Sequence, residues 1–302
     1  MSEDHHHHHP GPGNYDRAFA IGVALNLGFV LAEATGGWLA NSLALLADAG
    51  HNLSDVLGLL LAWGASVLSR RSPTRRRTYG LRRSSILAAL ANALLLLLAV
   101  GAIVWEAIGR ISAPEPVTGT LVIGLAGIGI VINTLTALMF VKGHHDMNIR
   151  AAFLHMAVDA GVSLGVVITG VIILYTGWQW VDSLTSLLIA LVIFLGTWSL
   201  LRDSLNLALD AVPDHIDPAR VRALLQSRPG VSEVHDLHIW AMSTTEIALT
   251  VHLVVQQLPD DDTLLYNLNH SLREEFGIAH CTIQLESAQA RHPCHLAPED
   301  VV

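Results

Sequence analysis

Two histidine–aspartate pairs with the same spacing occur in parts of the sequence that are otherwise strongly apolar. His51 precedes Asp55 by four residues, and His155 precedes Asp159 by four residues. Residues at i and i+4 share one face of an α-helix, so each pair presents an imidazole and a carboxylate side by side. Two such helices facing each other would offer two nitrogen and two oxygen donors, which is a tetrahedral set suited to Zn²⁺.

The depth of these acids in apolar sequence adds to this interpretation. An ionised Asp at bilayer depth costs at least ~2.5 kcal/mol, so such residues usually mark ion pathways. The plainer alternative is that each pair only forms hydrogen bonds inside a helix bundle, but its occurrence twice favours a metal site. Asp48, three residues before His51, is either an outer partner of the imidazole or a residue near the aqueous mouth. No His-Glu-x-x-His sequence is present, so a metalloprotease of that type has no motif.

The surrounding composition is that of an integral membrane protein. Of the 302 residues, 52% are hydrophobic and only 14% are charged, whereas soluble domains carry about 25% charged residues. A formal net charge of -9 gives no support to a nucleic-acid partner. Bilayer-spanning helices need roughly 20 apolar residues. Segments without any Asp, Glu, Lys or Arg are 84–105, 117–141, 160–181 and 183–201, and 18–47 contains only Glu33.

We predict six membrane-spanning helices, and the basic residues set their orientation. The second span reaches full length only if Asp48, His51 and Asp55 lie within the bilayer. Seven arginines lie between the second and third spans, where we expect them to anchor at anionic lipid headgroups, whereas the loops on the other side carry only Arg110. The positive-inside rule then places both termini in the cytoplasm, and we expect a bacterial inner membrane. The predicted spans lie near 17–38, 43–69, 86–109, 118–141, 151–175 and 182–201.

The sequence after Arg202 has the composition of a soluble domain. Helix and strand patterns alternate there as a helix at 218–227, strands at 231–242 and 246–256, a helix at 262–276 and a strand at 281–286. This αββαβ order predicts a small α+β domain of ferredoxin-like type. We therefore divide the chain into a flexible His-rich tail (1–16), a transport domain (17–201), a cytosolic domain (202–290) and a flexible tail (291–302). The run His5 to His9 is either a metal-gathering tail or a purification tag.

Several of these motifs resemble those of a known family. Ala47-Asp48-Ala49-Gly50-His51-Asn52-Leu53-Ser54-Asp55 and the segment from Asn148 to Asp159 resemble signatures of the cation diffusion facilitators, zinc/proton antiporters that export divalent metal from the cytoplasm. His235-Asp236-Leu237-His238-Ile239-Trp240 and the segment from His280 to Glu286 match as well, so the resemblance covers about residues 15–290. It implies a homodimer with one transport site per subunit. The implied ligands are His51, Asp55, His155 and Asp159, a set that resembles the zinc-preferring branch.

The resemblance also implies a second metal site in the cytosolic domain, where the metal would be structural or regulatory and would help to hold the dimer together. Its implied ligands are His235, His252, His280 and Glu286, with His238 as a bystander or substitute ligand. The alternative is that these are ordinary polar residues of a small domain. Cys294 is a further candidate, although no Cys-x-x-Cys accompanies it. The loop at 73–80 contains neither Asp nor His, so we predict no metal there.

The charges of the membrane motif predict an exchange mechanism. Two ionised aspartates are neutralised by one Zn²⁺ ion, whereas the empty site would hold unpaired buried charge unless protons enter it. Proton-for-zinc exchange follows from this requirement, with histidine as the carrier near neutral pH. The alternatives are a membrane-anchored metal sensor or store that transports nothing, and an ion channel. Of the other polar residues, we expect Glu33 to form interhelical hydrogen bonds and Asp182 to be solvated at the external interface.

Overall fold

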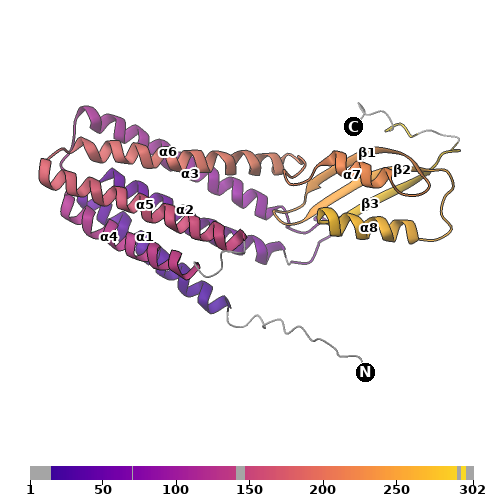
Figure 1. Cartoon of the computed structure of the whole chain (residues 1–302), viewed down its shortest axis with the longest axis horizontal. Coiled ribbons are helices and arrows are strands. Elements are labelled where there is room, and N and C mark those ends of the chain that lie inside the picture. The colour runs from indigo at the N-terminus through magenta and orange to yellow at the C-terminus, as the bar shows by residue number, and fades with distance from the viewer. Residues whose placement is uncertain (1–14, 70, 141–146, 291–293, 297–302) are drawn as a thin grey trace, which may run out of the picture. The chain divides into compact units, whose positions relative to one another are not determined.

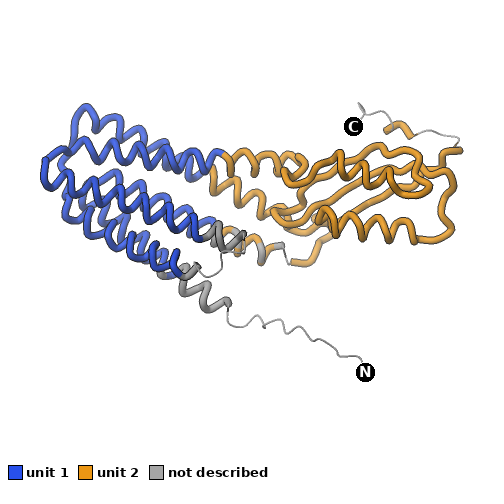
Figure 2. The backbone as a smooth tube through the Cα atoms, in the orientation of Figure 1, with its two compact units in different colours: residues 1–60, 94–198 blue, residues 61–93, 199–302 orange. Residues whose placement is uncertain are grey.

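The structure, a computed structural model, describes residues 15–69, 71–140, 147–290 and 294–296. The expected histidine-rich tail and most of the expected C-terminal tail lie outside these residues. The described chain divides into two compact units, which are coloured separately in Figure 2. Unit 1 comprises residues 1–60 and 94–198, and unit 2 comprises residues 61–93 and 199–302. Residues 61–93 thus group with the C-terminal part, and the expected domain boundary at residue 201 stays a prediction.

Six long helices occupy the positions of the six predicted spans (Figure 1). Four of them, α3 to α6, are long and apolar enough to cross a membrane, as measured on the described residues. By the same measure, the described residues of α1 and α2 do not qualify. The helix α2 carries Asp48, His51 and Asp55. The helices are α1 (Tyr15–Ala40), α2 (Leu43–Ser69), α3 (Ser84–Ser112), α4 (Gly119–Phe140), α5 (Met147–Thr176) and α6 (Trp180–Ala208).

Within unit 1, α4 packs closely against α5, and α1 packs against α4 (Figure 1). One close approach of α4 to α5 is at Gly119 and Gly170, because a Cβ atom on Gly119 would lie 2.8 Å from the backbone oxygen of Gly170. Small residues let membrane helices approach in this way. The buried apolar core of this unit joins α2, α4, α5 and α6 through residues such as Leu45, Val122, Val166 and Ile193.

The C-terminal part of unit 2 has the predicted α-β-β-α-β order, with boundaries that differ by a few residues. It contains α7 (Pro218–Gln226), β1 (Val231–Ala241), β2 (Ile247–Val255), α8 (Thr263–Phe276) and β3 (Ile278–Ser287). The sheet order is β1-β2-β3, in which β1 and β2 are antiparallel and β2 and β3 are parallel. The last strand begins three residues earlier than predicted, because the fully buried Ile278 pairs with Ile247.

The two faces of this sheet differ in character. Leu249, Val251 and Leu253 on β2 are completely buried and belong to the core that α7 and α8 help to form. Because strand side chains alternate between faces, the intervening residues Thr250 and His252 lie on the opposite face. That second face carries the polar side chains of the candidate cytosolic site.

Candidate functional site

The four side chains of the two His-x-x-x-Asp motifs lie together in unit 1, and each histidine contacts the acid of the other helix. His51 Nε2 on α2 lies 3.1 Å from Asp159 Oδ1 on α5. His155 Nε2 on α5 lies 3.2 Å from Asp55 Oδ2 on α2 and 3.7 Å from Asp159 Oδ2. The two imidazole rings are 6.0 Å apart between centroids. Asp159 therefore contacts both histidines and is the centre of the cluster.

These distances fit the donor set of a small tetrahedral ion. Donors bound at about 2.0–2.1 Å to Zn²⁺ lie about 3.3 Å from one another in a tetrahedron, close to the observed 3.1 and 3.2 Å. His51, Asp55 and Asp159 each offer a donor atom within 4.8 Å of the other two. A hydrogen bond between imidazole and carboxylate has a similar length, so the convergence of several donors, rather than any single distance, is the feature that suits a metal ion.

Exposure differs sharply across this cluster. The Asp159 side chain is 2% exposed and that of His51 is 19% exposed. The His155 and Asp55 side chains are 45% and 36% exposed. Relative to His51 and Asp159, Asp55 and His155 each lie one helical turn nearer to the ends of α2 and α5 that adjoin the basic loops, so the more exposed half of the cluster lies on that side.

A second layer of buried polar groups supports the helices that carry the cluster. Asp48 is 0% exposed, and its Oδ2 accepts a hydrogen bond from Ser163 Oγ, one turn after Asp159, at 2.9 Å. Asn52, next to His51, donates from Nδ2 to Glu33 Oε2 at 2.9 Å. Asp48 thus ties α2 to α5, and Glu33 ties α1 to α2, as we expected of Glu33. Sequence reasoning missed Ser163, whose type and position carried no distinguishing signal.

At the other end of α2, Asp182 is not solvated, and that expectation is corrected. It is only 1% exposed. Its Oδ2 accepts a hydrogen bond from the backbone N–H of Leu43 at 2.6 Å, and its Oδ1 accepts one from Ser42 Oγ at 2.5 Å. The first amides of a helix have no partner within the helix and favour a nearby carboxylate. The start of α2 is therefore capped by a side chain from α6.

A second cluster of metal-binding side chain types lies in unit 2. His252 Nδ1 is 3.0 Å from Glu286 Oε1, and His235 Nε2 is 3.5 Å from Glu286 Oε2. Cys294 Sγ lies 3.5 Å from His252 Nδ1. All four residues offer donor atoms within 4.8 Å of one another. Two imidazoles, a carboxylate and a thiol form a donor set that Zn²⁺ accepts readily.

His280 lies away from this cluster, although it is on the same face of the sheet. It precedes Glu286 by six residues on β3, and a strand rises about 3.3 Å per residue, so roughly 20 Å separates the two positions. Its exposed imidazole instead packs edge-on against Tyr79, with ring centroids 5.4 Å apart. The cluster contains Cys294, the further candidate from the sequence, in its place.

His238 has a partner of its own at an irregularity in β1. Its Nε2 lies 2.8 Å from Asp236 Oδ1, and Asp236 Oδ2 lies 3.5 Å from His252 Nε2. Asp236 adopts a φ of 49°, where the pairing of β1 with β2 shifts register between His235 and His238. This bulge keeps His238 beside the cluster but outside the set of four.

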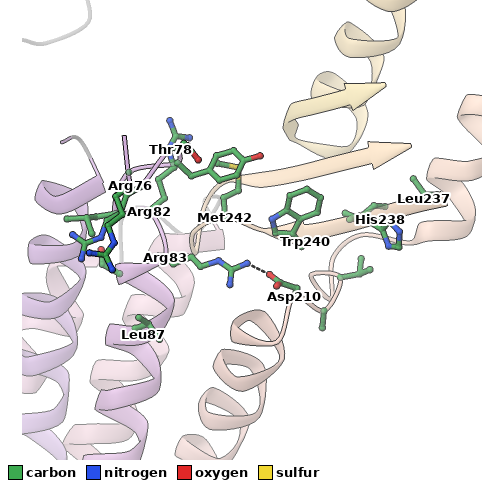
Figure 3. A pocket seen from close by; sticks show the side chains of 18 residues that line it. Arg76, Thr78, Arg82, Arg83, Leu87, Asp210, Leu237, His238, Trp240 and Met242 are labelled. Carbon is green, nitrogen blue, oxygen red and sulfur yellow. Dashed lines mark hydrogen bonds and ion pairs between the residues drawn. The ribbon is translucent and has the colours of Figure 1, made fainter. Parts of the chain in front are cut away.

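The basic loop between α2 and α3 forms ion pairs with the C-terminal part of unit 2. Arg82 Nη1 lies 2.6 Å from Glu246 Oε2, and Arg83 pairs with Asp210 (Figure 3). Among the described residues, the two groups of potential metal ligands lie elsewhere and include no residue of the loop at 73–80. The loop lines a cavity that we consider below.

Comparisons with known proteins show the family to which this chain belongs. Residues 19–207 match the cation efflux transmembrane domain, and residues 213–288 match the cytoplasmic domain of cation efflux proteins. The chain belongs to the cation diffusion facilitator family. The segment with the six long helices matches the membrane domain of that family, and the small α+β domain matches the cytoplasmic one.

Several bacterial efflux proteins are similar to this chain over most of its length. The metal cation efflux system protein CzcD of Cupriavidus metallidurans is 39% identical over 98% of this chain and 91% of its own length. The zinc transporter ZitB of Escherichia coli is 40% identical over 92% and 89%. The cadmium, cobalt and zinc/H(+)-K(+) antiporter of Bacillus subtilis is 34% identical over 93% and 92%. A solved metal-bound C-terminal domain of the Cupriavidus CzcD matches 24% of this chain, with 39% identity and a TM-score of 0.22.

Proposed function

We propose that the protein exports Zn²⁺ from the cytoplasm in exchange for protons, and that His51, Asp55, His155 and Asp159 hold the ion during transport. The observation that carries this proposal is the cross-pairing of the two motifs, in which each imidazole lies within 3.2 Å of a carboxylate on the other helix. Donor atoms from α2 and α5 thus converge in a geometry suited to a tetrahedral ion. The names of the relatives, which include a zinc transporter and an antiporter, support the same class of function.

Exchange with protons follows from the charge of the empty cluster. Two ionised aspartates carry a charge of minus two, which Zn²⁺ cancels, so the loaded site can be enclosed among apolar helices. Without metal, the nearly inaccessible Asp159 would be an unneutralised buried charge, which is costly. Protons taken up from outside neutralise the empty site, and the next Zn²⁺ ion must displace them in order to bind.

The exposure of the cluster indicates the side from which metal enters. Asp55 is four residues nearer than His51 to the end of α2 that precedes the basic loop, and His155 is four residues nearer than Asp159 to the start of α5. This half of the cluster is the more exposed one. By the positive-inside rule those ends are cytoplasmic. We infer that this arrangement receives Zn²⁺ from the cytoplasm, while Asp159 and His51 lie deeper along the path toward the other side.

The proposal requires all six long helices to cross the bilayer, with both termini in the cytoplasm of a bacterial inner membrane. Four helices qualify by length and apolarity alone. The ionisable side chains of α2 have partners on α5, and Glu33 of α1 accepts a hydrogen bond from Asn52 of α2. Pairing of this kind offsets the cost of placing such groups in the membrane.

We further propose that the cytoplasmic domain holds a resident Zn²⁺ ion through His235, His252, Glu286 and Cys294. Two of these side chains are held within the fold, since the His235 side chain is 4% exposed and that of Glu286 is 17% exposed. Because the domain belongs to the dimerisation class of the family, a homodimer is the proposed assembly. In this proposal His238 is a neighbour of the site, and His280 lies outside it.

A membrane-anchored sensor or store would need only the cytoplasmic cluster. The membrane cluster favours transport, because a sensor has no need for carboxylates at bilayer depth. A channel is disfavoured because two carboxylates and two imidazoles that grip one ion would slow its release.

The three functions are separated by measuring zinc and proton fluxes together in sealed proteoliposomes. We expect an imposed zinc gradient to drive proton movement in the opposite direction, and the Asp159→Ala variant to lose both fluxes while still reconstituting normally. Zinc flux without any pH change would identify a channel. The absence of both fluxes in the wild-type protein would identify a sensor or store.

A further inference from the structure

A large cavity in unit 2 lies between the basic loop and strand β1, apart from both candidate metal sites. Its volume is about 1030 Å³. Figure 3 shows arginine side chains of the loop on one side and Trp240, His238 and Leu237 of β1 on the other. Pockets of several hundred Å³ with a few polar groups on a largely apolar lining are typical small-molecule sites.

The polar wall of this cavity has an excess of positive charge. Four arginines line it, whereas Asp210 is the one carboxylate among the lining residues. Arg83 pairs with Asp210, and Arg82 pairs with Glu246. Arg76 and Arg77 are exposed, and neither forms an ion pair within the described part of the chain. Two guanidinium groups therefore remain available for an anion.

Much of the remaining lining is apolar, and it reaches a membrane helix. Leu237, Ile239, Trp240 and Met242 come from β1 and the residue after it. Leu87 comes from the first turn of α3 and is 58% exposed. Since α3 is apolar enough to cross a bilayer, its first turn lies at the depth of the lipid headgroups, where phosphate groups are concentrated and the acyl chains begin.

We propose that this cavity binds the headgroup of an anionic phospholipid. In this proposal Arg76 and Arg77 contact the phosphate of the lipid, and Leu87 and Trp240 contact the apolar part of the lipid. Guanidinium groups bind phosphate through two parallel, charge-assisted hydrogen bonds. Basic pockets beside membrane helices on the cytoplasmic side suit such headgroups. This proposal differs from a general attraction of the basic loop to the membrane. It predicts that the arginines that line the cavity bind the lipid, whereas other arginines of the same loop do not.

The test compares two double variants that remove the same charge from one loop. Arg76→Gln/Arg77→Gln changes arginines that line the cavity, and Arg71→Gln/Arg75→Gln changes arginines that do not. The full-length protein in neutral detergent is titrated with phosphatidylglycerol, phosphatidylcholine or inorganic phosphate. The rise in Tm is followed at about 150 mM salt, which screens exposed charges beyond about 8 Å.

We expect phosphatidylglycerol, but not phosphatidylcholine, to raise the Tm of the wild type and of Arg71→Gln/Arg75→Gln. In Arg76→Gln/Arg77→Gln, half-maximal stabilisation should need at least about tenfold more lipid. Equal losses in the two double variants would reduce the effect to general surface attraction and overturn the proposal. Stabilisation by inorganic phosphate without any by phosphatidylglycerol would assign the cavity to free phosphate and would also overturn it.

Discussion

Asp159 is the residue on which the membrane cluster converges, because its two oxygens approach His51 and His155 separately. The four-residue spacing of each motif predicted a side-by-side pair on one helix. The structure shows that the stronger contacts cross between helices, so each motif alone would be an incomplete site. The two carboxylates also differ: Asp159 is buried, whereas the Asp55 side chain is 36% exposed.

The choice of imidazole at position 51 should set metal preference. In His51→Asp, one nitrogen donor becomes an oxygen donor, and oxygen ligands suit larger, harder ions better than imidazole does. We expect the ratio of cadmium to zinc transport to rise severalfold, as measured by competing the two metals in proteoliposomes. An unchanged ratio in a variant that still transports would remove His51 from the ligand set.

The two cysteines should differ in reactivity, and zinc should change only one of them. Burial raises the pKa of the Cys281 thiol to about 11, so at pH 7 only about one molecule in 10⁴ carries the reactive thiolate there. Its alkylation rate should rise about tenfold per pH unit up to pH 11. Cys294 should react readily in the zinc-free protein and be protected by added Zn²⁺.

Mass spectrometry of peptides after timed alkylation measures both rates. His252→Ala serves as the control, because losing this neighbour of Cys294 should abolish protection by zinc while leaving Cys281 slow. If zinc does not protect Cys294 in the wild type, the thiol is not a ligand and the cytoplasmic site must have another fourth donor.

Sequence reasoning at this scale identified the residues with unusual chemistry but not their partners. His51, Asp55, His155 and Asp159 stood out because charge in apolar sequence is rare. Ser163 did not, since a serine in a membrane helix is ordinary. That Cys294 lies in the cytoplasmic cluster while His280 lies apart depends on strand register and on the position of Cys294 beside His252, neither of which the spacing of residues encodes.

At the scale of elements, the close packing of α4 against α5 holds the second ligand-bearing helix in place. In Gly119→Ala, the new Cβ atom would lie 2.8 Å from the backbone oxygen of Gly170, which cannot move aside cheaply. We expect a loss of about 1–3 kcal/mol in stability and a lower Tm for the purified protein.

Gly124→Ala on the same helix is the matched control, because no heavy atom lies within 4 Å of the position that its new Cβ atom would take. Alanine is a better helix former than glycine by about 1 kcal/mol, so this variant should keep or slightly raise the Tm. Equal destabilisation by both substitutions would mean that the contact between Gly119 and Gly170 does not limit packing.

The existence of the elements was predictable, and their ends were less so. Long apolar runs predicted most of the six helices, because backbone groups in lipid must be paired within a helix, whereas the second was predicted only by accepting Asp48, His51 and Asp55 within its span. The helix α6 nevertheless continues to Ala208, seven residues past the predicted end of its span, because a helix need not stop at the edge of its apolar segment. The cap that Asp182 provides for α2 links residues 139 positions apart, which no local pattern reveals.

At the scale of the whole molecule, we propose one Zn²⁺ ion in transit in the membrane domain and one resident ion in the cytoplasmic domain. The two sites differ in chemistry, since the first has only nitrogen and oxygen donors and the second includes the sulfur of Cys294. Zinc–sulfur bonds of about 2.3 Å are longer than zinc–nitrogen or zinc–oxygen bonds of about 2.0–2.2 Å. The two ions can therefore be distinguished spectroscopically in the intact protein.

The most direct measurement is zinc content together with zinc K-edge X-ray absorption of a full-length variant without the cytoplasmic site, His252→Ala/Glu286→Ala. We predict one Zn²⁺ ion per chain, with four nitrogen or oxygen neighbours at about 2.0–2.1 Å and no sulfur, and its loss on adding Asp159→Ala. Zinc that stays bound after Asp159→Ala, or zinc that is absent while all four membrane ligands are intact, would contradict the assignment.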